Sequence, residues 1–354
     1  MIRATTNGTL KAYRTNLNKS TLRLNSARDK VLTQRNFNSY AEDPSAAAES
    51  FQLRRSFLRV SAQLDVSESV ARKFDTAYSA IDSVVSMVDN QADGSALSAV
   101  LAAVNDTTGG GRTALGGELK QLAEGIVQAL NCKYGDQYIF SGADGLTVPF
   151  EWHETADGQQ LFYRGYRMDA TEANNPDDFS ALTFITDHEA RYVDVGVGLE
   201  EDENGNLITS SAFDSTLQGS AVLGWGSDDN GDPNNIASII HRMGTILSNC
   251  DEETGAWKTE AEQQEFIRLM NKFSDSSSEL KKYHVDMSTK ASYLANNQSV
   301  LEDTAYTLNE QILAIDECDL ADAITSFSWA QYCYNAALKM GNSVLSESLM
   351  DYIN

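Results

Sequence analysis

The sequence predicts an α+β fold: an elongated rod of long α-helices from both termini, paired antiparallel in a coiled-coil-like manner, with a β-rich outer domain inserted between them. Residues 9–93 and 256–340 contain no glycine, and the 354-residue chain has only four prolines, so both ends can form long helices. In these stretches apolar residues recur at alternating steps of three and four, the spacing of a coiled-coil seam. Between them lie short apolar runs separated by turn sequences, a pattern typical of strands.

The N-terminal stretch is expected to form two helices separated by a break. Turn-forming residues concentrate at 34–44, where Asp43 can cap the second helix and Pro44 can occupy its first position, since proline has no N–H to leave unsatisfied. We expect the second helix to run over 45–104. The first seam is Leu10, Tyr13, Leu17, Ser20, Leu24, Ala27 and Val31, and the second is Leu53, Phe57, Val60, Leu64, Ser67, Ala71, Phe74, Tyr78, Ile81, Val85 and Val88.

The middle of the chain is predicted to contain strands with a helix on either side. Leucine and isoleucine recur at helical spacing at 115–129, before the strands, and at 236–247, after them. The expected strands are 138–140, 161–163, 183–185, 192–197 and 207–209.

The C-terminal stretch mirrors the N-terminal one. A long seam covers 280–315, about 54 Å of helix at 1.5 Å per residue, and a shorter seam begins at Leu320 after a phase slip. Because each end has a short outer seam and a longer inner one, the simplest fold pairs the two ends with each other. The predicted domains are terminal helices at 1–35 and 316–354, a helical rod domain at 36–137 and 256–315, and the β-rich outer domain at 138–255.

The outer and inner seams are expected to have different partners. A pair of outer helices buries too little apolar area to be stable alone, so we expect it to be disordered in the monomer and to order against other subunits. The predicted subunit assembly interface is Leu10, Leu17, Leu24, Val31, Leu320, Ile324, Phe327, Tyr334, Leu338 and Leu345. The predicted intramolecular helix seam is Leu53, Phe57, Val60, Leu64, Phe74, Ile81, Leu294, Leu301, Leu308 and Ile315.

The charge distribution argues against nucleic acid and membranes as partners. The formal net charge is −24, and 18 of these net negative charges fall at 131–255, so phosphates would be repelled. No apolar run is long enough to span a bilayer, and residues 1–9 lack the apolar region of a cleavable signal peptide. The first 60 residues carry a net +7 interleaved at helical spacing, which favours a helix face complementary to an acidic partner face.

No residue pattern predicts a catalytic, cofactor or metal site, and we expect no enzyme activity. His284 falls on the inner seam, where packing is favoured over ligand binding. The acidic strings at 200–206 and 228–232 are interpreted as surface turns, because Pro233 stands where an EF-hand needs glycine. The cysteines lack C-x-x-C spacing and are interpreted as small apolar residues, whose oxidation outside the cell stays open: Cys132, Cys250, Cys318 and Cys333.

Four segments together resemble the flagellin superfamily. The break at 36–44, N-F-N-S-Y-A-E-D-P, is similar to the turn between the first terminal helix and the long inner helix of that family. G-D-Q-Y-I-F-S-G at 135–142 resembles the stretch that opens the outer domain in the hook-associated branch. D-L-A-D-A-I-T at 319–325 and S-L-M-D-Y-I at 348–353 resemble the start and the end of its C-terminal helix.

This resemblance implies an extracellular structural subunit of the bacterial flagellum, exported without a cleavable signal peptide through the flagellar type III channel. It further implies a ring of identical subunits at the junction between hook-associated protein 1 (FlgK) and flagellin, and a cytoplasmic chaperone that holds the terminal helices before export. Two alternatives stay open. A flagellin filament subunit shares the helical ends, and a secreted adhesin or hydrolase would use the middle domain.

Overall fold

The computed structural model describes residues 2–90, 94–105, 111–156, 158–196, 202, 208 and 212–353, without the side chains of 2–7, 9 and 343–353. It divides into two compact units, Met1–Ala62 with Leu301–Asn354, here called the terminal unit, and Gln63–Val300, here called the central unit. Helices α2 (Pro44–Val88) and α8 (Glu260–Asp316) contribute residues to both units. The three-part domain division expected from the sequence stays a prediction.

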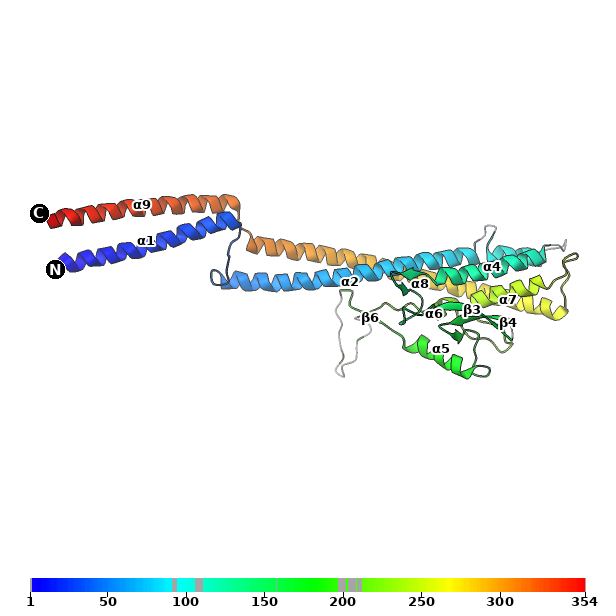
Figure 1. Ribbon diagram of the computed structural model, residues 1–354. Coiled ribbons are helices and arrows are strands. Elements are labelled where there is room, and N and C mark those ends of the chain that lie inside the picture. The colour runs from blue at the N-terminus through cyan, green and yellow to red at the C-terminus, as the bar shows by residue number, and fades with distance from the viewer. Residues whose placement is uncertain are drawn as a thin grey trace. The chain divides into compact units, whose positions relative to one another are not determined.

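The terminal unit is built of helices. Its first and last helices, α1 (Ile2–Thr33) and α9 (Leu320–Ile353), pack side by side and antiparallel (Figure 1). Helix α2 begins where the sequence predicts, because Asp43 Oδ1 accepts hydrogen bonds from the N–H groups of Ser45 and Ala46 at 3.1 and 3.0 Å. Asp319 starts α9 in the same way, with its Oδ1 accepting from the Ala321 N–H at 2.7 Å.

The single helix expected over 45–104 is in fact two helices, α2 and α3 (Ala96–Asn105). Ser95 and Ser98 cap α3 reciprocally, each hydroxyl accepting a hydrogen bond from the other residue's N–H at 3.2 Å. Before this cap, Gly94 has a φ of 94°, a left-handed conformation that an α-helix cannot continue through. Helix α3 packs against the following helix, so apolar residues at helical spacing continue beyond the break. For that reason the spacing alone does not reveal that the helix is interrupted.

Two helices of the central unit touch at glycines. Helix α4 (Arg112–Leu130), which the sequence predicts, packs along α7 (Ile236–Ser248). A Cβ atom at Gly116 would lie 2.6 Å from the backbone nitrogen of Ser248, and one at Gly244 would lie 2.8 Å from the carbonyl oxygen of Gly116. Only glycine therefore fits at both positions. Around this contact the two helices bury Leu119, Ala123, Ile126, Leu130, Ile236, Ile240, Met243 and Leu247.

Within the described residues, the central unit holds three small antiparallel sheets. The largest consists of β3 (Phe150–Thr155), β4 (Gly158–Tyr163) and β5 (Tyr166–Arg167), with Phe150 opposite Tyr163. The other two pair β1 (Lys133–Tyr134) with β2 (Gln137–Tyr138), and β6 (Tyr192–Val193) with β7 (Phe213–Asp214). Leu161 and Tyr163 of β4 and Phe150 of β3 are buried, so both strands contribute to the core.

Region 138–255 contains more helix than the sequence analysis expected. The predicted strand 183–185 lies inside α5 (Pro176–His188), where Leu182 and Ile185 face the core and Phe184 is exposed. A proline in the first turn, followed by two aspartates, favours a helix start at this point. That start signal outweighs the β propensity of Thr183, Phe184 and Ile185. A short helix, α6 (Gly219–Leu223), also lies in this region.

The other predicted strands differ in length from the observed ones. The strand expected at 161–163 is part of β4, whereas those expected at 138–140 and 192–197 end at Tyr138 and Val193. In 207–209 only Ile208 belongs to the described residues. The fold class is nonetheless α+β, as predicted. None of the described helices is long and apolar enough to cross a membrane.

Candidate assembly surface

Helix α9 contacts α1 mainly through small residues. All seven positions of the predicted first seam are half-buried along α1. On α9 the buried and half-buried positions step by four and three and include four small residues: Ala323, Phe327, Ala330, Tyr334, Ala337 and Gly341. A Cβ atom at Gly341 would overlap the ring and hydroxyl of Tyr13, so this tyrosine lies directly against the α9 backbone.

Large apolar side chains remain exposed around the α1–α9 pair. Trp329 and Tyr332 are 69% and 67% exposed, and their rings stack with centroids 5.9 Å apart. Together with Ile324 they line a shallow groove of about 530 Å³. The other exposed large apolar residues of the two helices are Leu22, Leu32, Leu320, Leu338 and Met340. A grouped apolar surface of this kind marks a protein interaction site, because covering it removes apolar area from water.

The two chain crossovers of the terminal unit are hydrogen-bonded to each other. Gln34, with a φ of 56°, ends α1, and its carbonyl oxygen accepts from the Cys318 N–H at 3.1 Å. The N–H of Asn36 donates to the carbonyl oxygen of Asp316 at 2.8 Å. Its side-chain amide donates to the carbonyl oxygens on either side of Asp316, at 2.9 and 2.8 Å. One asparagine thus satisfies three carbonyl groups at the end of α8, which have no partner within that helix.

The Asp316 side chain joins α8 to α2. The Ser50 hydroxyl donates to its carboxylate at 2.6 Å, and the Arg54 guanidinium pairs with the other oxygen. Burial alone would raise the pKa of Asp316, but the hydrogen bonds from Ser50 and Arg54 and the positive charges of Arg54 and Arg35 outweigh it. The pKa of this carboxyl therefore lies below its usual range.

Replacing Asp316 by asparagine should destabilise the protein in a pH-dependent way. Because the folded-state pKa is lowered, the stabilisation is complete above the unfolded-state pKa of about 3.9 and is lost as the pH falls through the folded-state pKa. Urea titrations of the full chain should show D316N less stable than wild type at neutral pH, with the gap closing in acid. Asp303→Asn, an exposed change on the same helix, should show no such trend. A gap that is constant with pH would contradict the role of this carboxylate.

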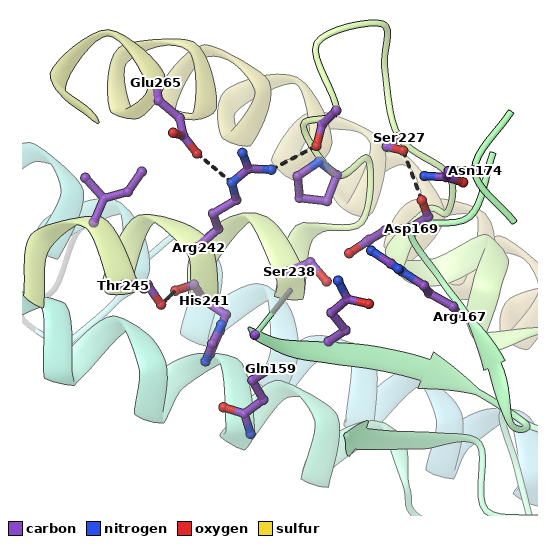
Figure 2. A pocket seen from close by; sticks show the side chains of 15 residues that line it. Gln159, Arg167, Asp169, Asn174, Ser227, Ser238, His241, Arg242, Thr245 and Glu265 are labelled. Carbon is purple, nitrogen blue, oxygen red and sulfur yellow. Dashed lines mark hydrogen bonds and ion pairs between the residues drawn. The ribbon is translucent and has the colours of Figure 1, made fainter. Parts of the chain in front are cut away.

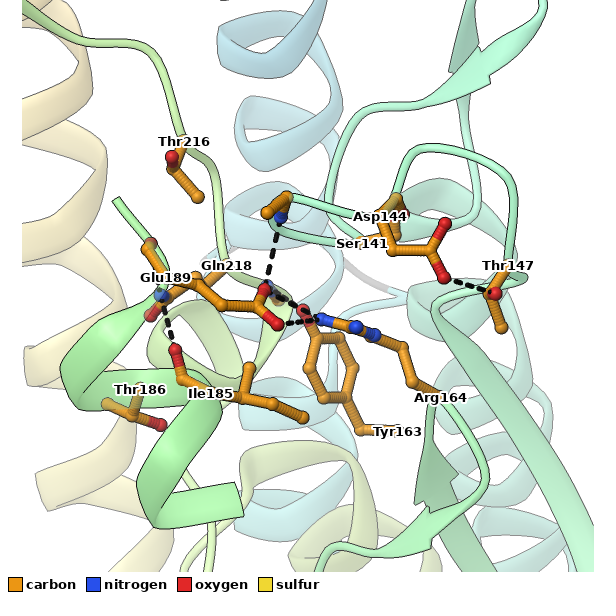
Figure 3. Close-up of polar contacts among 12 residues, drawn as sticks. Ser141, Asp144, Thr147, Tyr163, Arg164, Ile185, Thr186, Glu189, Thr216 and Gln218 are labelled. Carbon is orange, nitrogen blue, oxygen red and sulfur yellow. Dashed lines mark hydrogen bonds and ion pairs between the residues drawn. The ribbon is translucent and has the colours of Figure 1, made fainter. Parts of the chain in front are cut away.

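The segment after β2 forms a loop held by its own side chains (Figure 3). The Ser141 hydroxyl contacts the carbonyl oxygen of Asp144, whose carboxylate accepts a hydrogen bond from the Thr147 hydroxyl at 2.5 Å. Phe140 is fully buried, and its carbonyl oxygen accepts from the Tyr163 hydroxyl at 2.9 Å. The motif at 135–142 is thus a folding element that docks the loop on β4.

A partly buried ion pair joins the turn between β4 and β5 to the end of α5, next to this loop. Arg164 Nη1 lies 2.9 and 2.7 Å from the two carboxylate oxygens of Glu189, and the side chains are 15% and 16% exposed. Glu189 also accepts a hydrogen bond from the Ala143 N–H at 3.1 Å. Gly142 has a φ of 74°, and a Cβ atom there would lie 2.7 Å from Glu189 Oε2, so glycine is required beside the ion pair. Figure 3 shows Arg164, Tyr163 and Glu189 converging on this point.

Comparison with known proteins adds to this geometry. Residues 5–144 match the family model of the bacterial flagellin N-terminal helical region. The N-terminal helical part of the chain is flagellin-like. The match spans α1, α2, α3, α4 and the loop that contains Ser141 and Gly142.

Similar solved structures come from three organisms. One from Vibrio parahaemolyticus, assigned to a flagellar hook-associated protein, has a TM-score of 0.50 and 14% identity over 77% of this chain and 99% of that chain. FlgL of Bacillus cereus has a TM-score of 0.42 and 14% identity, over 74% of this chain and 99% of its own. FlgL of Xanthomonas campestris has a TM-score of 0.40 and 13% identity, over 76% and 99%. The first likeness indicates a shared fold. No curated protein matches the chain.

The residues predicted for subunit assembly fall into three groups. Those half-buried between α1 and α9 are Leu10, Leu17, Leu24, Val31, Phe327 and Tyr334. Those exposed outside the pair are Leu320, Ile324 and Leu338. The side chain of Leu345 lies outside the described part of the chain. Sequence reasoning missed Ala323, Ala330, Ala337 and Gly341 because it ranked large apolar residues. Small residues at the same four-three spacing were the available signal.

The ten residues predicted to form the inner seam are all buried or half-buried. Phe74, Ile81 and Leu294 are fully buried in the central unit. Leu53, Phe57, Val60, Leu64, Leu301, Leu308 and Ile315 are partly buried or nearly buried. Contacts between α2 and α8 in the central unit include Lys281 with Asp89 and His284 stacked on Tyr78, with ring centroids 4.7 Å apart. His284 is therefore a packing residue of α8.

The residues weighed for chemistry have protein partners in the described part of the chain. Lys272 pairs with Asp228 at 2.9 Å and Arg268 with Asp232 at 3.2 Å, so the turn at 228–232 is neutralised by cations of α8. In the acidic string 200–206 only Asp202 belongs to the described residues. No group of three or more His, Cys, Asp or Glu side chains among the described residues is placed to hold a metal. The four cysteines are free thiols, and burial raises the pKa of Cys132 to about 11.

Proposed function

We propose that the chain is a hook–filament junction subunit of the FlgL type, laid as a ring of identical copies between hook-associated protein 1 (FlgK) and the flagellin filament. The observation that carries this proposal is the apolar surface left exposed on the α1–α9 pair, which includes the stacked rings of Trp329 and Tyr332. In a monomer this apolar surface stays in contact with water. Neighbouring subunits would bury it, and the free energy of that burial would offset the entropy lost when the helices become ordered. The fold shared with the Vibrio hook-associated protein supports the assignment.

Export and chaperone binding form part of the same proposal. The surface that neighbouring subunits would cover is exposed before assembly, and a cytoplasmic chaperone that holds α1 and α9 would cover it first. The flagellar type III route needs no cleavable signal peptide. No catalytic role is proposed, because the surface carries apolar packing groups and no cluster of reactive side chains.

Cells that express a chain lacking residues 1–35 and 316–354 should assemble no filament, whereas the purified truncated protein should stay folded. A sharper change is Trp329→Ser with Tyr332→Ser, which leaves the helix intact and removes the apolar centre. Electron microscopy of complemented deletion cells should then show hooks without filaments. Phe184→Ser removes an equally exposed ring from α5 and should leave filaments normal. Full filaments on the truncated chain would overturn the junction role and favour an adhesin or hydrolase.

The second candidate is a flagellin filament subunit, which the match to the flagellin N-terminal region favours. Both functions would use the terminal helices in the same way, so the truncation does not separate them. Copy number per flagellum does: quantitative mass spectrometry of isolated flagella should find roughly the number of subunits in one ring, whereas a filament protein would be the dominant species.

A further inference from the structure

A polar cavity in the central unit lies between the β3–β4–β5 sheet, the start of α7 and α8. Its lining residues all fall between 158 and 265 in the sequence. Its volume is about 450 Å³, within the usual range of about 300–1,000 Å³ for small-molecule sites. Figure 2 shows Arg167, Asp169 and Ser238 gathered at one end and Arg242, His241 and Thr245 at the other. No part of the proposed junction function uses this cavity.

The charged groups of the cavity are already matched to each other. Arg242 Nε lies 2.6 Å from Glu265 Oε1, and Arg242 also pairs with Asp232 at 3.6 Å. Burial raises the pKa of Asp169 to about 6, against the opposing effects of the nearby Arg167 charge and of a hydrogen bond that its carboxylate accepts from the Asn235 amide at 2.5 Å. A ligand with a net charge would therefore find no excess of the opposite charge. An anion or a cation is disfavoured on this ground.

Two neutral groups in the wall lack a partner within the described residues. Gln160 Oε1 and Ser238 Oγ are buried atoms that make no hydrogen bond, on residues only 8% and 6% exposed. Leaving such a group unsatisfied costs about 1–3 kcal/mol, so a protein keeps it at the expense of stability. Gln160 Oε1 can only accept a hydrogen bond, whereas the Ser238 hydroxyl can donate or accept. A hydroxyl group is chemically suited to either of them, because it can both donate and accept.

The rest of the wall offers apolar surface to the same ligand. Ile246, Pro233 and the ring of His241 line the cavity, and burial lowers the pKa of His241, so its imidazole is neutral at pH 7. His241 is held in place by Trp152, whose ring centroid lies 4.9 Å away. The wall thus combines uncharged hydrogen-bonding groups with C–H and ring surfaces.

We propose that this cavity binds a neutral, hydroxyl-rich ligand of the monosaccharide or disaccharide class, with Gln160 and Ser238 as its hydrogen-bonding anchors. Sugar hydroxyls donate and accept at once, and the C–H face of a pyranose matches Ile246, Pro233 and His241. The site would give an exported subunit a contact to glycans, independent of its assembly helices.

The test uses the full-length monomer with D-glucose, D-galactose, D-mannose and N-acetyl-D-glucosamine, each followed by saturation-transfer NMR and calorimetry. At least one sugar should bind saturably with a Kd of about 1 mM or tighter. Ser238→Ala and Gln160→Met should each weaken that binding by about fivefold or more, while the melting temperature stays the same or rises, because each change removes an unsatisfied buried group.

Ser248→Ala is the matched control on the same helix. The Ser248 hydroxyl donates to the Gly244 carbonyl oxygen at 2.7 Å and does not line the cavity, so this variant should bind sugar like wild type. Three results would overturn the proposal: no binding by any of the four sugars, wild-type affinity in both anchor variants, or tighter binding of L-alanine or inorganic phosphate than of any sugar. Circular dichroism of each variant confirms that a loss of binding is not a loss of fold.

Discussion

Replacing Gly116 by alanine should lower the free energy of unfolding by about 2–3 kcal/mol, because the new methyl group meets backbone atoms that cannot rotate away. The nitrogen of Ser248 and the carbonyl oxygen of Gly244 would lie 2.6 and 2.7 Å from the added carbon, closer than real Cβ contacts. Helices α4 and α7 would have to move apart, which would also separate the buried leucines and isoleucines that pack between them. Urea titration of the full chain, followed by tryptophan fluorescence, measures the loss.

The neighbouring residue supplies the control for this prediction. Gly117 lies in the same helix, but a Cβ atom there has nothing within 4 Å. Gly117→Ala should therefore stabilise the protein by about 0.5–1 kcal/mol through helix propensity alone. If Gly116→Ala lowers the free energy of unfolding and Gly117→Ala raises it, the close packing of α4 against α7 is the cause. Equal effects at 116 and 117 would show that the two helices do not meet at Gly116.

Replacing Glu189 by alanine should cost about 3 kcal/mol, the typical penalty for leaving one charge of a buried ion pair without its partner. Arg164 would keep its charge in a site where the side chain is 15% exposed, and the Ala143 N–H would lose its acceptor. The β4–β5 turn and the end of α5 would lose their ion pair, and the loop at 138–147 would lose its hydrogen bond to Glu189. Hydrogen exchange should then report faster opening of the Ala143 amide than of the α4 amides.

A double variant separates the charge from the packing. Arg164→Met combined with Glu189→Met removes both charges and fills similar volume, so much of the loss should be recovered. If the double variant were as unstable as the sum of its single variants, the ion pair would contribute nothing and the hydrogen bonds to Glu189 would carry the whole effect.

The sequence predicted the long helices better than it predicted their contacts. Asp43 and Pro44 mark the start of α2 by a local mechanism, a capped first turn, which needs no tertiary information. The α1 seam was visible because its residues are large and apolar. The α9 seam was visible only at Phe327 and Tyr334, because Ala330 and Gly341 contribute space rather than apolar area.

The remaining misses have tertiary causes. Residues 183–185 have strand propensity, yet α5 forms because Pro176 starts a helix and Leu182 and Ile185 then face the core together. Gly116 and Gly117 are indistinguishable in the sequence, and only the position of α7 separates a contact residue from a free one. The cavity at Gln160 and Ser238 joins a strand and a helix far apart in the chain, so no local motif predicts it.

The antiparallel pairing of α1 with α9 fixes an order of events in time. Tyr13 and Gly341, which touch in the pair, are 328 positions apart in the sequence. Their contact therefore closes a loop that includes nearly the whole chain. Closing such a loop is slow, and α1 has no partner until the last helix has been made. Helix α1 precedes α9 in the chain and is thus among the last helices to find its partner, and during that interval any surface with a matching apolar groove can reach α1 before α9 does.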